Sequence, residues 1–421
     1  MRIWLENVYL KNKTALTNAW YLSIFQMLSL VFPLITYPYI IKVIGDELYG
    51  SILLGQGVAY FLSAFVSYGF NLSITRDISL NKEDIVFVSK IYTATILCKS
   101  LIFIPVIIMF GIYGYLTVLP EKQMLFFLCA GPLVYELLFP TWLFQGLEKM
   151  KYITVVTVIS RFILLLSIFS FVKEEADAKL FALINISFYI ASGLFAQYVA
   201  FSSLAVRFVR VKLSFCLQAF KNGYAIFLST IFIAMKDRLN VIIVGSIFGP
   251  QQVVIYDLAM KIVSVISIPQ NIIFSAFYPS VVKDRDIGKI KKLGALITFI
   301  NTIIVIGVFA ILPYAYSYLI GESYPDVYNL YILSSTIILI GISGVMGRFT
   351  MLAFGYDKLL ARTTIVNCVV YFMSILVYSL LSIEKSLIDF SILIFLIYSS
   401  ELLIRFFGLR FSGLYNEKDD N

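Results

Sequence analysis

The chain has 421 residues, of which 60% are hydrophobic and only 14% are charged. Soluble domains carry roughly 25% charged residues, and a soluble core of this size cannot absorb so much apolar surface. The chain contains no histidine, the commonest general base, metal ligand and pH switch. Composition therefore excludes a soluble globular protein and predicts a membrane protein.

A helix needs about 20 mostly apolar residues to cross a bilayer. The N-terminus has no short apolar core followed by a small-residue cleavage site, so the first apolar run is expected to stay in the membrane as a signal anchor. Windows of this length predict an all-α polytopic membrane protein of about twelve transmembrane helices, at residues 17–41, 51–75, 85–111, 123–144, 152–172, 180–204, 222–246, 254–282, 295–320, 328–354, 361–383 and 387–408.

The orientation follows from the basic residues of the connections. With the N-terminus in the cytoplasm, most connecting lysines and arginines fall on the cytoplasmic side, so both termini are predicted to be cytoplasmic. The longest connection is the basic segment 205–221, which is predicted to be a cytoplasmic linker. It separates an N-terminal six-helix lobe at 1–204 from a C-terminal six-helix lobe at 222–421 that ends in a short cytoplasmic tail. Residues 44–50 and 247–257 resemble each other weakly, as expected for two related lobes.

Motifs for chemistry are missing from the sequence. It contains no GxxxxGK[ST] phosphate loop, no GxSxG nucleophile elbow and no cluster of metal ligands. Cys98, Cys129, Cys216 and Cys368 form no CxxC pair and lie in or beside apolar stretches, as buried inert thiols do. No enzyme activity, cofactor or metal is therefore predicted.

Several charged residues nevertheless fall inside predicted spans, where each central charge costs about 2.5–3.5 kcal/mol unless it faces protein or water. Some have simple explanations. Asp257 with Lys261 and Glu401 with Arg405 are spaced as ion pairs on one helix face. Lys90, Arg348 and Arg405 lie close enough to cytoplasmic ends to reach headgroups with their side chains.

Other charges lie in the middle of their spans. Lys99, Arg161, Lys236 and Arg238 are predicted, together with Arg348, to line a cationic cavity that binds the substrate. Because Asp237 can neutralise only one of its neighbours, this interior keeps a surplus of positive charge. It suits a substrate with negative charge, such as a diphosphate or an acidic sugar. Without histidine, carboxylates of raised pKa are the candidates for ion coupling, namely Glu136, Asp237 and Asp257.

Helix breakers occur in several of the spans. Their two interpretations are ordinary kinks with small-residue packing, and helices that bend during transport. The residues are Pro33, Pro38, Pro132, Pro140, Pro269, Pro279, Gly341, Gly344 and Gly347.

Four stretches, at residues 33–56, 68–80, 140–153 and 235–262, resemble Wzx-type polysaccharide flippases, which share a superfamily with MATE exporters and the lipid II flippase. The most specific is PTWLFQGLEKMKYI at 140–153. The resemblance implies a V-shaped pair of six-helix lobes around a central cationic cavity. It also implies that alternating access, coupled to a proton or sodium ion, moves an undecaprenyl-diphosphate-linked oligosaccharide to the outer leaflet of the bacterial inner membrane.

The same resemblance suggests partners and a gate. The partners are the lipid-linked oligosaccharide, the membrane, the coupling cation, and the polymerase and chain-length regulator of the pathway, but no nucleic acid. Glu148, Lys149 and Lys151, in the predicted loop after the fourth span, would contact headgroups or lock an inward-facing gate. The alternative for these three residues is a solvated charged loop.

Three other functions stay open from the sequence. A MATE-type exporter of small molecules would have the same fold, but the basic interior argues against cationic drugs. A membrane polysaccharide polymerase or ligase is disfavoured by the short outer loops. The third is a scaffold for polysaccharide assembly that transports nothing.

Overall fold

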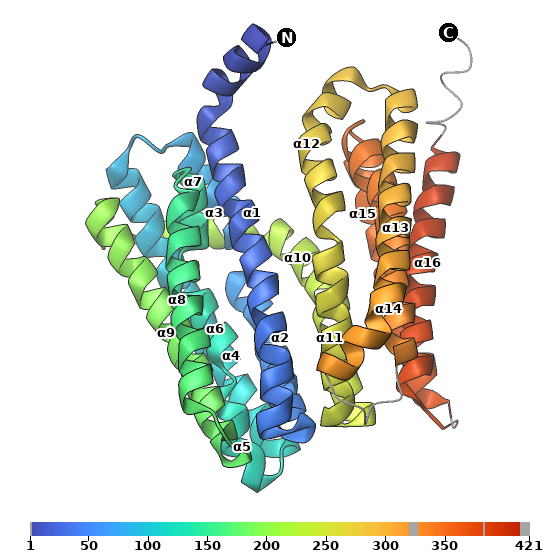
Figure 1. Cartoon of the computed structure of the whole chain (residues 1–421). Coiled ribbons are helices and arrows are strands. Elements are labelled where there is room, and N and C mark those ends of the chain that lie inside the picture. Colours follow the sequence, from blue (N-terminus) through green and yellow to red (C-terminus); the bar gives the residue numbers. More distant parts are fainter. Residues whose placement is uncertain (1, 320–326, 382–383, 413–421) are drawn as a thin grey trace. The chain divides into compact units, whose positions relative to one another are not determined.

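The computed structural model describes residues 2–319, 327–381 and 384–412 (Figure 1), which are almost entirely helical. The side chains of Lys236 and Asp237, both assigned to the predicted cavity, lie outside the described part of the chain. The chain divides into two compact units, Met1–Gly245 and Ser246–Asn421.

The first unit is built from a long N-terminal helix, a set of broken helices and a long last helix. Its helices are α1 (Arg2–Ile44), α2 (Asp46–Ser67), α3 (Phe70–Leu80), α4 (Ile85–Thr117), α5 (Pro120–Leu128), α6 (Gly131–Leu138), α7 (Thr141–Gly146), α8 (Met150–Phe171), the short η1 (Glu175–Asp177), α9 (Ala178–Ser203) and α10 (Leu213–Phe248), which ends just inside the second unit. Within this unit α1 packs on α8, and α6 packs on α2 and α9.

Among the described residues, the second unit contains six further α-helices and one wide helical segment. They are α11 (Pro250–Ile266), α12 (Ile268–Asp284), α13 (Ile287–Leu319), α14 (Val327–Gly344), the π-helix η2 (Val345–Leu352), α15 (Asp357–Leu380) and α16 (Leu387–Phe411). Helix α14 packs on α11, α13 and α16.

The prediction of a polytopic all-helical membrane protein is confirmed. Within the described residues, 11 helices are long and apolar enough to cross a bilayer. The predicted span 222–246 lies within α10, of which the stretch Arg238–Phe248 is apolar but shorter. Residues 205–212 of the predicted linker are non-helical, and α10 begins at Leu213. Contacts within the chain group most of α10 with the first unit.

Three predicted spans are interrupted helices, and local backbone chemistry explains each break. The span 51–75 breaks between α2 and α3, where Tyr68 and Gly69 both have positive φ. The span 123–144 falls into α5, α6 and α7, with Pro132 and Pro140 at the starts of the later pieces. The span 254–282 breaks at Ser267, just before Pro269. Proline supplies no N–H for the turn before it, so a continuous ladder of backbone bonds is interrupted there.

A pair of glycines shows that both halves of the chain use the same turn. Gly45 caps the N-terminus of α2 with φ 79° and ψ 161°, and Gly249 caps α11 with φ 86° and ψ 172°. L-residues rarely adopt this backbone region, whereas glycine enters it at little cost. The weak internal similarity of the sequence therefore corresponds to a shared turn.

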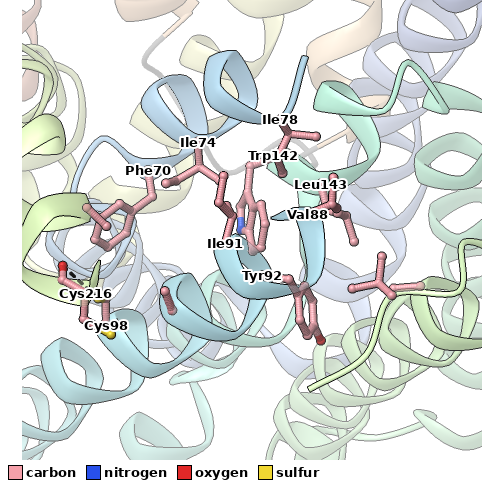
Figure 2. Close-up of a cluster of buried hydrophobic side chains, with 14 residues drawn as sticks. Phe70, Ile74, Ile78, Val88, Ile91, Tyr92, Cys98, Trp142, Leu143 and Cys216 are labelled. Carbon is pink, nitrogen blue, oxygen red and sulfur yellow. Dashed lines mark hydrogen bonds between the residues drawn. The ribbon is translucent and has the colours of Figure 1, made fainter. Parts of the chain in front are cut away.

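The motif at 140–153 is anchored in a buried hydrophobic core of the first unit (Figure 2). Trp142 and Leu143 of α7 lie fully buried beside Ile78 of α3 and Val88 of α4. The Trp142 backbone carbonyl also accepts a hydrogen bond from Thr75, at 3.2 Å. The core thus fixes α7 against α3 and α4, directly after the break that Pro140 causes.

Glycines at tight helix contacts give a prediction about stability. A Cβ at Gly114 of α4 would lie 2.4 Å from the Phe126 ring, whereas a Cβ at Gly111 on the same helix would meet nothing within 4 Å. We expect Gly114→Ala to destabilise the protein by about 1–3 kcal/mol through overpacking. Gly111→Ala is the matched control and should leave thermal unfolding unchanged. Equal unfolding temperatures for the two variants would contradict the packing described for α4 and α5.

Candidate substrate site and interior ion pairs

Two backbone carbonyls of the first unit lie four residues before a proline, and each accepts a hydrogen bond from a basic side chain of another helix. Pro33 of α1 has no N–H, so the carbonyl of Ser29, four residues earlier, loses its helical partner. Arg161 of α8 supplies the missing donor, with Nη1 3.1 Å from the Ser29 oxygen. Arg161, predicted to bind substrate, therefore also satisfies the α1 carbonyl that Pro33 leaves without a helical donor.

Lys99 of α4 does the same at the end of α6. Pro140 cannot donate to the carbonyl of Glu136, and Lys99 Nζ donates to that oxygen at 3.0 Å. The same ammonium forms an ion pair with the Glu136 carboxylate at 2.7 Å. Asn71 of α3 completes the group by donating to this carboxylate at 3.2 Å.

This geometry joins two residues that were predicted to have separate roles. Lys99 was assigned to substrate binding and Glu136 to ion coupling, yet the two compensate each other's charge. The Lys99 side chain has 0% exposed surface, so it presents no charge to a substrate in this conformation. Its position indicates a structural role in holding the broken helix α6.

Two arginines of the first unit lie beside tyrosines. The Arg238 guanidinium of α10 lies 5.2 Å from the centre of the Tyr60 ring. The hydroxyls of Tyr60 and Tyr189 are 2.8 Å apart, and the rings of Tyr189 and Tyr135 meet edge to face at 5.7 Å. Arg161 lies within electrostatic range of Tyr135 and Tyr189. We call these five residues the arginine–tyrosine cluster.

The two arginines of the cluster differ from Lys99 in their partners. Among the residues that the structure describes, neither Arg161 nor Arg238 forms an ion pair with a carboxylate. Arg161 Nε is buried without a hydrogen-bond partner, and Arg238 is exposed. Guanidinium groups in this state can donate to phosphate or carboxylate oxygens in a two-pronged fashion. The cluster thus places guanidinium donors beside hydroxyl and aromatic groups.

The sequence predicted the two arginines of this cluster but not the three tyrosines. Tyr60, Tyr135 and Tyr189 come from α2, α6 and α9, and the chain contains 28 tyrosines. Their position beside the arginines depends on how the helices pack. The one feature of the sequence that could have indicated a cluster tyrosine is that Tyr135 directly precedes Glu136, a charged residue in the middle of a span.

In the second unit both predicted ion pairs along helix faces are present. Lys261 pairs with Asp257 on α11, and Arg405 pairs with Glu401 on α16 at 2.9 Å. The Arg405 side chain is only 14% exposed, so the alternative that it reaches out to headgroups is wrong. Arg348 is exposed, and its guanidinium lies 5.1 Å from the centre of the Phe274 ring.

The predicted gate residues lie on exposed surface, in the connection after α7 and the first turn of α8. Glu148 has a positive φ of 57° and forms an ion pair with Lys82 at 3.1 Å. Lys149 and Lys151 are exposed. Exposed pairs contribute about 0–1 kcal/mol, so this contact is a weak connection between the α3–α4 and α7–α8 loops. In the described part of the chain, no group of three His, Cys, Asp or Glu residues is arranged to hold a metal.

These features define a multi-pass membrane protein, and comparison with solved structures shows that its fold is that of the MATE transporters. An inward-facing multidrug resistance MATE transporter of the MOP superfamily matches 92% of this chain and 99% of its own, with a TM-score of 0.63 at 13% identity. The MATE multidrug transporter DinF-BH matches 96% of both chains with a TM-score of 0.55 at 12% identity.

The family follows from sequence comparison. Residues 15–285 match the family model described as polysaccharide biosynthesis protein, and the chain belongs to this family. It is 29% identical, over 82% of its length and 86% of the relative's, to a protein of Escherichia coli (strain K12) whose name proposes O-antigen transport. A similarly named protein of Shigella dysenteriae is 26% identical over 82% of this chain and 87% of its own. The resemblance to Wzx-type flippases is thereby confirmed at the level of the family.

Proposed function

We propose that this protein is a flippase. It moves an undecaprenyl-diphosphate-linked oligosaccharide from the cytoplasmic to the outer leaflet of the bacterial inner membrane, for O-antigen or another surface polysaccharide. The family and the names of the two relatives support this substrate class. The observation that carries the proposal is the arginine–tyrosine cluster, where Arg161 Nε is buried without a hydrogen-bond partner.

The chemistry of such a cargo explains the need for the cluster. A diphosphate and a chain of sugar hydroxyls cannot enter hydrocarbon without losing their hydrogen bonds to water. Arg161 and Arg238 can replace that water at the diphosphate, and the tyrosine rings and hydroxyls can contact sugars. The apolar tail can stay in the bilayer. Access alternates between the two membrane faces, so the polar head never crosses lipid.

Ion coupling belongs to the same proposal. Glu136, Asp237 and Asp257 are the candidate carboxylates. Glu136 and Asp257 hold Lys99 and Lys261 in this conformation, so a proton or sodium ion that reaches either one competes with a lysine ammonium. Such competition would couple cation entry to a rearrangement of α4 and α6, or of α11. No catalytic role is proposed for any residue.

The experiment that tests this function locates the lipid-linked unit in cells that lack the protein. We expect the unit to accumulate in the inner leaflet, protected from a glycosidase added to spheroplasts, and to become accessible when the chain is restored. Accumulation in the outer leaflet without polymerisation would instead identify a polymerase or ligase. Normal export in its absence would identify a role outside the transport path.

The alternative with a specific observation in its favour is a MATE-type exporter of small molecules, because the solved structures of similar fold include multidrug transporters. The basic character of the arginine–tyrosine cluster disfavours cationic drugs by charge repulsion. Uptake of a cationic dye by vesicles containing the purified protein separates the two functions. We expect no transport of the dye above that of empty vesicles.

A further inference from the structure

The wide turn where α14 continues into η2 receives side chains from two other helices at two glycines. A Cβ at Gly344 would lie 2.7 Å from Cζ of Phe274, which comes from α12. A Cβ at Gly347 would lie 3.1 Å from Nη1 of Arg405, which comes from α16. A side chain at Gly344 would force Phe274 to shift, and one at Gly347 would push the Arg405 guanidinium away by a few tenths of an ångström.

Arg405 is held firmly at this turn. Its Nη1 donates to the carbonyl and the hydroxyl of Ser343, at 2.8 and 2.7 Å, on the last turn of α14. Its Nη2 lies 2.9 Å from the Glu401 carboxylate. That carboxylate also accepts hydrogen bonds from Ser343 and from Asn367 of α15, both at 3.2 Å. The group is partly buried and joins opposite charges, as expected for a structural support.

Arg348, inside η2, is the opposite case. Arg348 is an exposed residue whose guanidinium lies over the Phe274 ring, and that ring in turn meets Phe349 edge to face at 5.0 Å. Among the described residues no carboxylate pairs with Arg348, and Arg405 lies within electrostatic range of it. A guanidinium stacked on a ring keeps its planar edge of N–H donors available for an oxyanion. π-helical turns of this kind are rare and occur frequently at functional sites.

We infer that η2 presents Arg348 to the phosphate group of a lipid, with Phe274 as its platform and Gly347, Glu401 and Arg405 as positioning residues. The inference rests on the proposed function if the phosphate belongs to the carried lipid. A phospholipid headgroup offers the same chemistry to an exposed arginine in a membrane-spanning helix, and the experiment has an arm for each source.

The probe for the carried lipid is a short isoprenyl diphosphate, and its uncharged alcohol is the reference ligand. The probe for the headgroup is phosphatidylglycerol, added as a competitor to the purified protein. We expect Arg348→Gln to weaken diphosphate binding by roughly tenfold, the loss typical of one charged hydrogen-bonded contact. Binding of the alcohol should stay as it is in the unaltered chain.

The positioning role has its own variants. Gly347→Ala should displace the Arg405 guanidinium and weaken diphosphate binding to a similar extent. Gly307→Ala, on α13, is the control because a Cβ there meets nothing within 4 Å. Arg405→Lys keeps the positive charge but lacks the planar set of N–H donors, so it should bind the diphosphate little better than Gly347→Ala does. A merely structural role would lower the unfolding temperature without changing the ratio of diphosphate to alcohol affinity.

The outcomes separate this inference from the proposed function. If phosphatidylglycerol displaces the diphosphate probe and only the binding of phosphatidylglycerol depends on Arg348, the position is a headgroup site. The inference then stands without the carried lipid. Diphosphate binding that depends on Arg348 and resists phosphatidylglycerol supports both. If the chain exports its cargo normally while Arg348→Gln and Gly347→Ala bind both phosphate lipids as the unaltered chain does, the function stands and this inference is wrong.

Discussion

Replacement of Lys99 by methionine is expected to destabilise the protein by about 3–5 kcal/mol, as breaking a buried ion pair from one side does. The substitution leaves the Glu136 carboxylate without its charge partner. It also leaves the Glu136 backbone carbonyl without a hydrogen-bond donor, because Pro140 has no N–H to offer. Thermal unfolding of the purified protein in detergent measures the effect. Because α6 carries Tyr135, transport should be lost as well.

Two further variants identify the cause. Lys90→Met changes an exposed lysine of the same helix and should have no effect on unfolding. Adding Glu136→Leu to Lys99→Met removes the stranded carboxylate, so the double variant should be more stable than Lys99→Met alone. The carbonyl stays unpaired, and recovery is therefore expected to be partial. A Lys99→Met protein as stable as the unaltered chain would show that the pair does not support α6.

Replacement of Arg161 by glutamine is expected to slow export of the diphosphate cargo by roughly 10- to 100-fold, the range for one charged hydrogen-bonded contact. Glutamine keeps an N–H that can donate to the Ser29 carbonyl, so α1 should keep this contact and the unfolding temperature should change little. Arg161→Lys keeps the positive charge but lacks the planar set of N–H donors. Its export rate should therefore lie between those of the unaltered chain and Arg161→Gln. The rate of translocation in reconstituted vesicles is the measurement.

Arg76→Gln is the matched control for the Arg161 variant. It removes an arginine that is 77% exposed and lies outside the arginine–tyrosine cluster. Its expected rate is that of the unaltered chain. If the Arg161→Gln protein translocates the cargo at the normal rate but unfolds at a lower temperature, Arg161 only supports α1 through the Ser29 carbonyl.

The sequence was informative where the physics is local. Hydropathy and length predicted eleven of the spans, because each span must be apolar over a fixed distance. Pro132, Pro140 and Pro269 lie at helix breaks, whereas Pro33, Pro38 and Pro279 lie inside continuous helices. Spacing along one helix predicted the pairs of Asp257 with Lys261 and Glu401 with Arg405, since residues four apart share a face.

The sequence was uninformative where contacts cross between helices. Lys99 and Arg161 look alike in sequence, as single basic residues in apolar spans. Their difference depends on which carbonyl and which carboxylate the neighbouring helices bring to them. Lys99 meets Glu136, whereas Arg161 meets the Ser29 carbonyl and no described carboxylate. The tyrosines beside Arg161 were missed for the same reason.

The central claim is that Arg161 and Arg238 recognise the negative charge of the cargo. Its most direct test uses vesicles with one glycan attached either to an isoprenyl diphosphate or to an uncharged isoprenyl lipid. Translocation of both is compared between the unaltered chain and the double variant Arg161→Gln/Arg238→Gln. We predict that the unaltered chain prefers the diphosphate cargo and that the double variant moves both at the same slow rate. Equal rates for the two cargoes in the unaltered chain, with no change in the double variant, would contradict the claim.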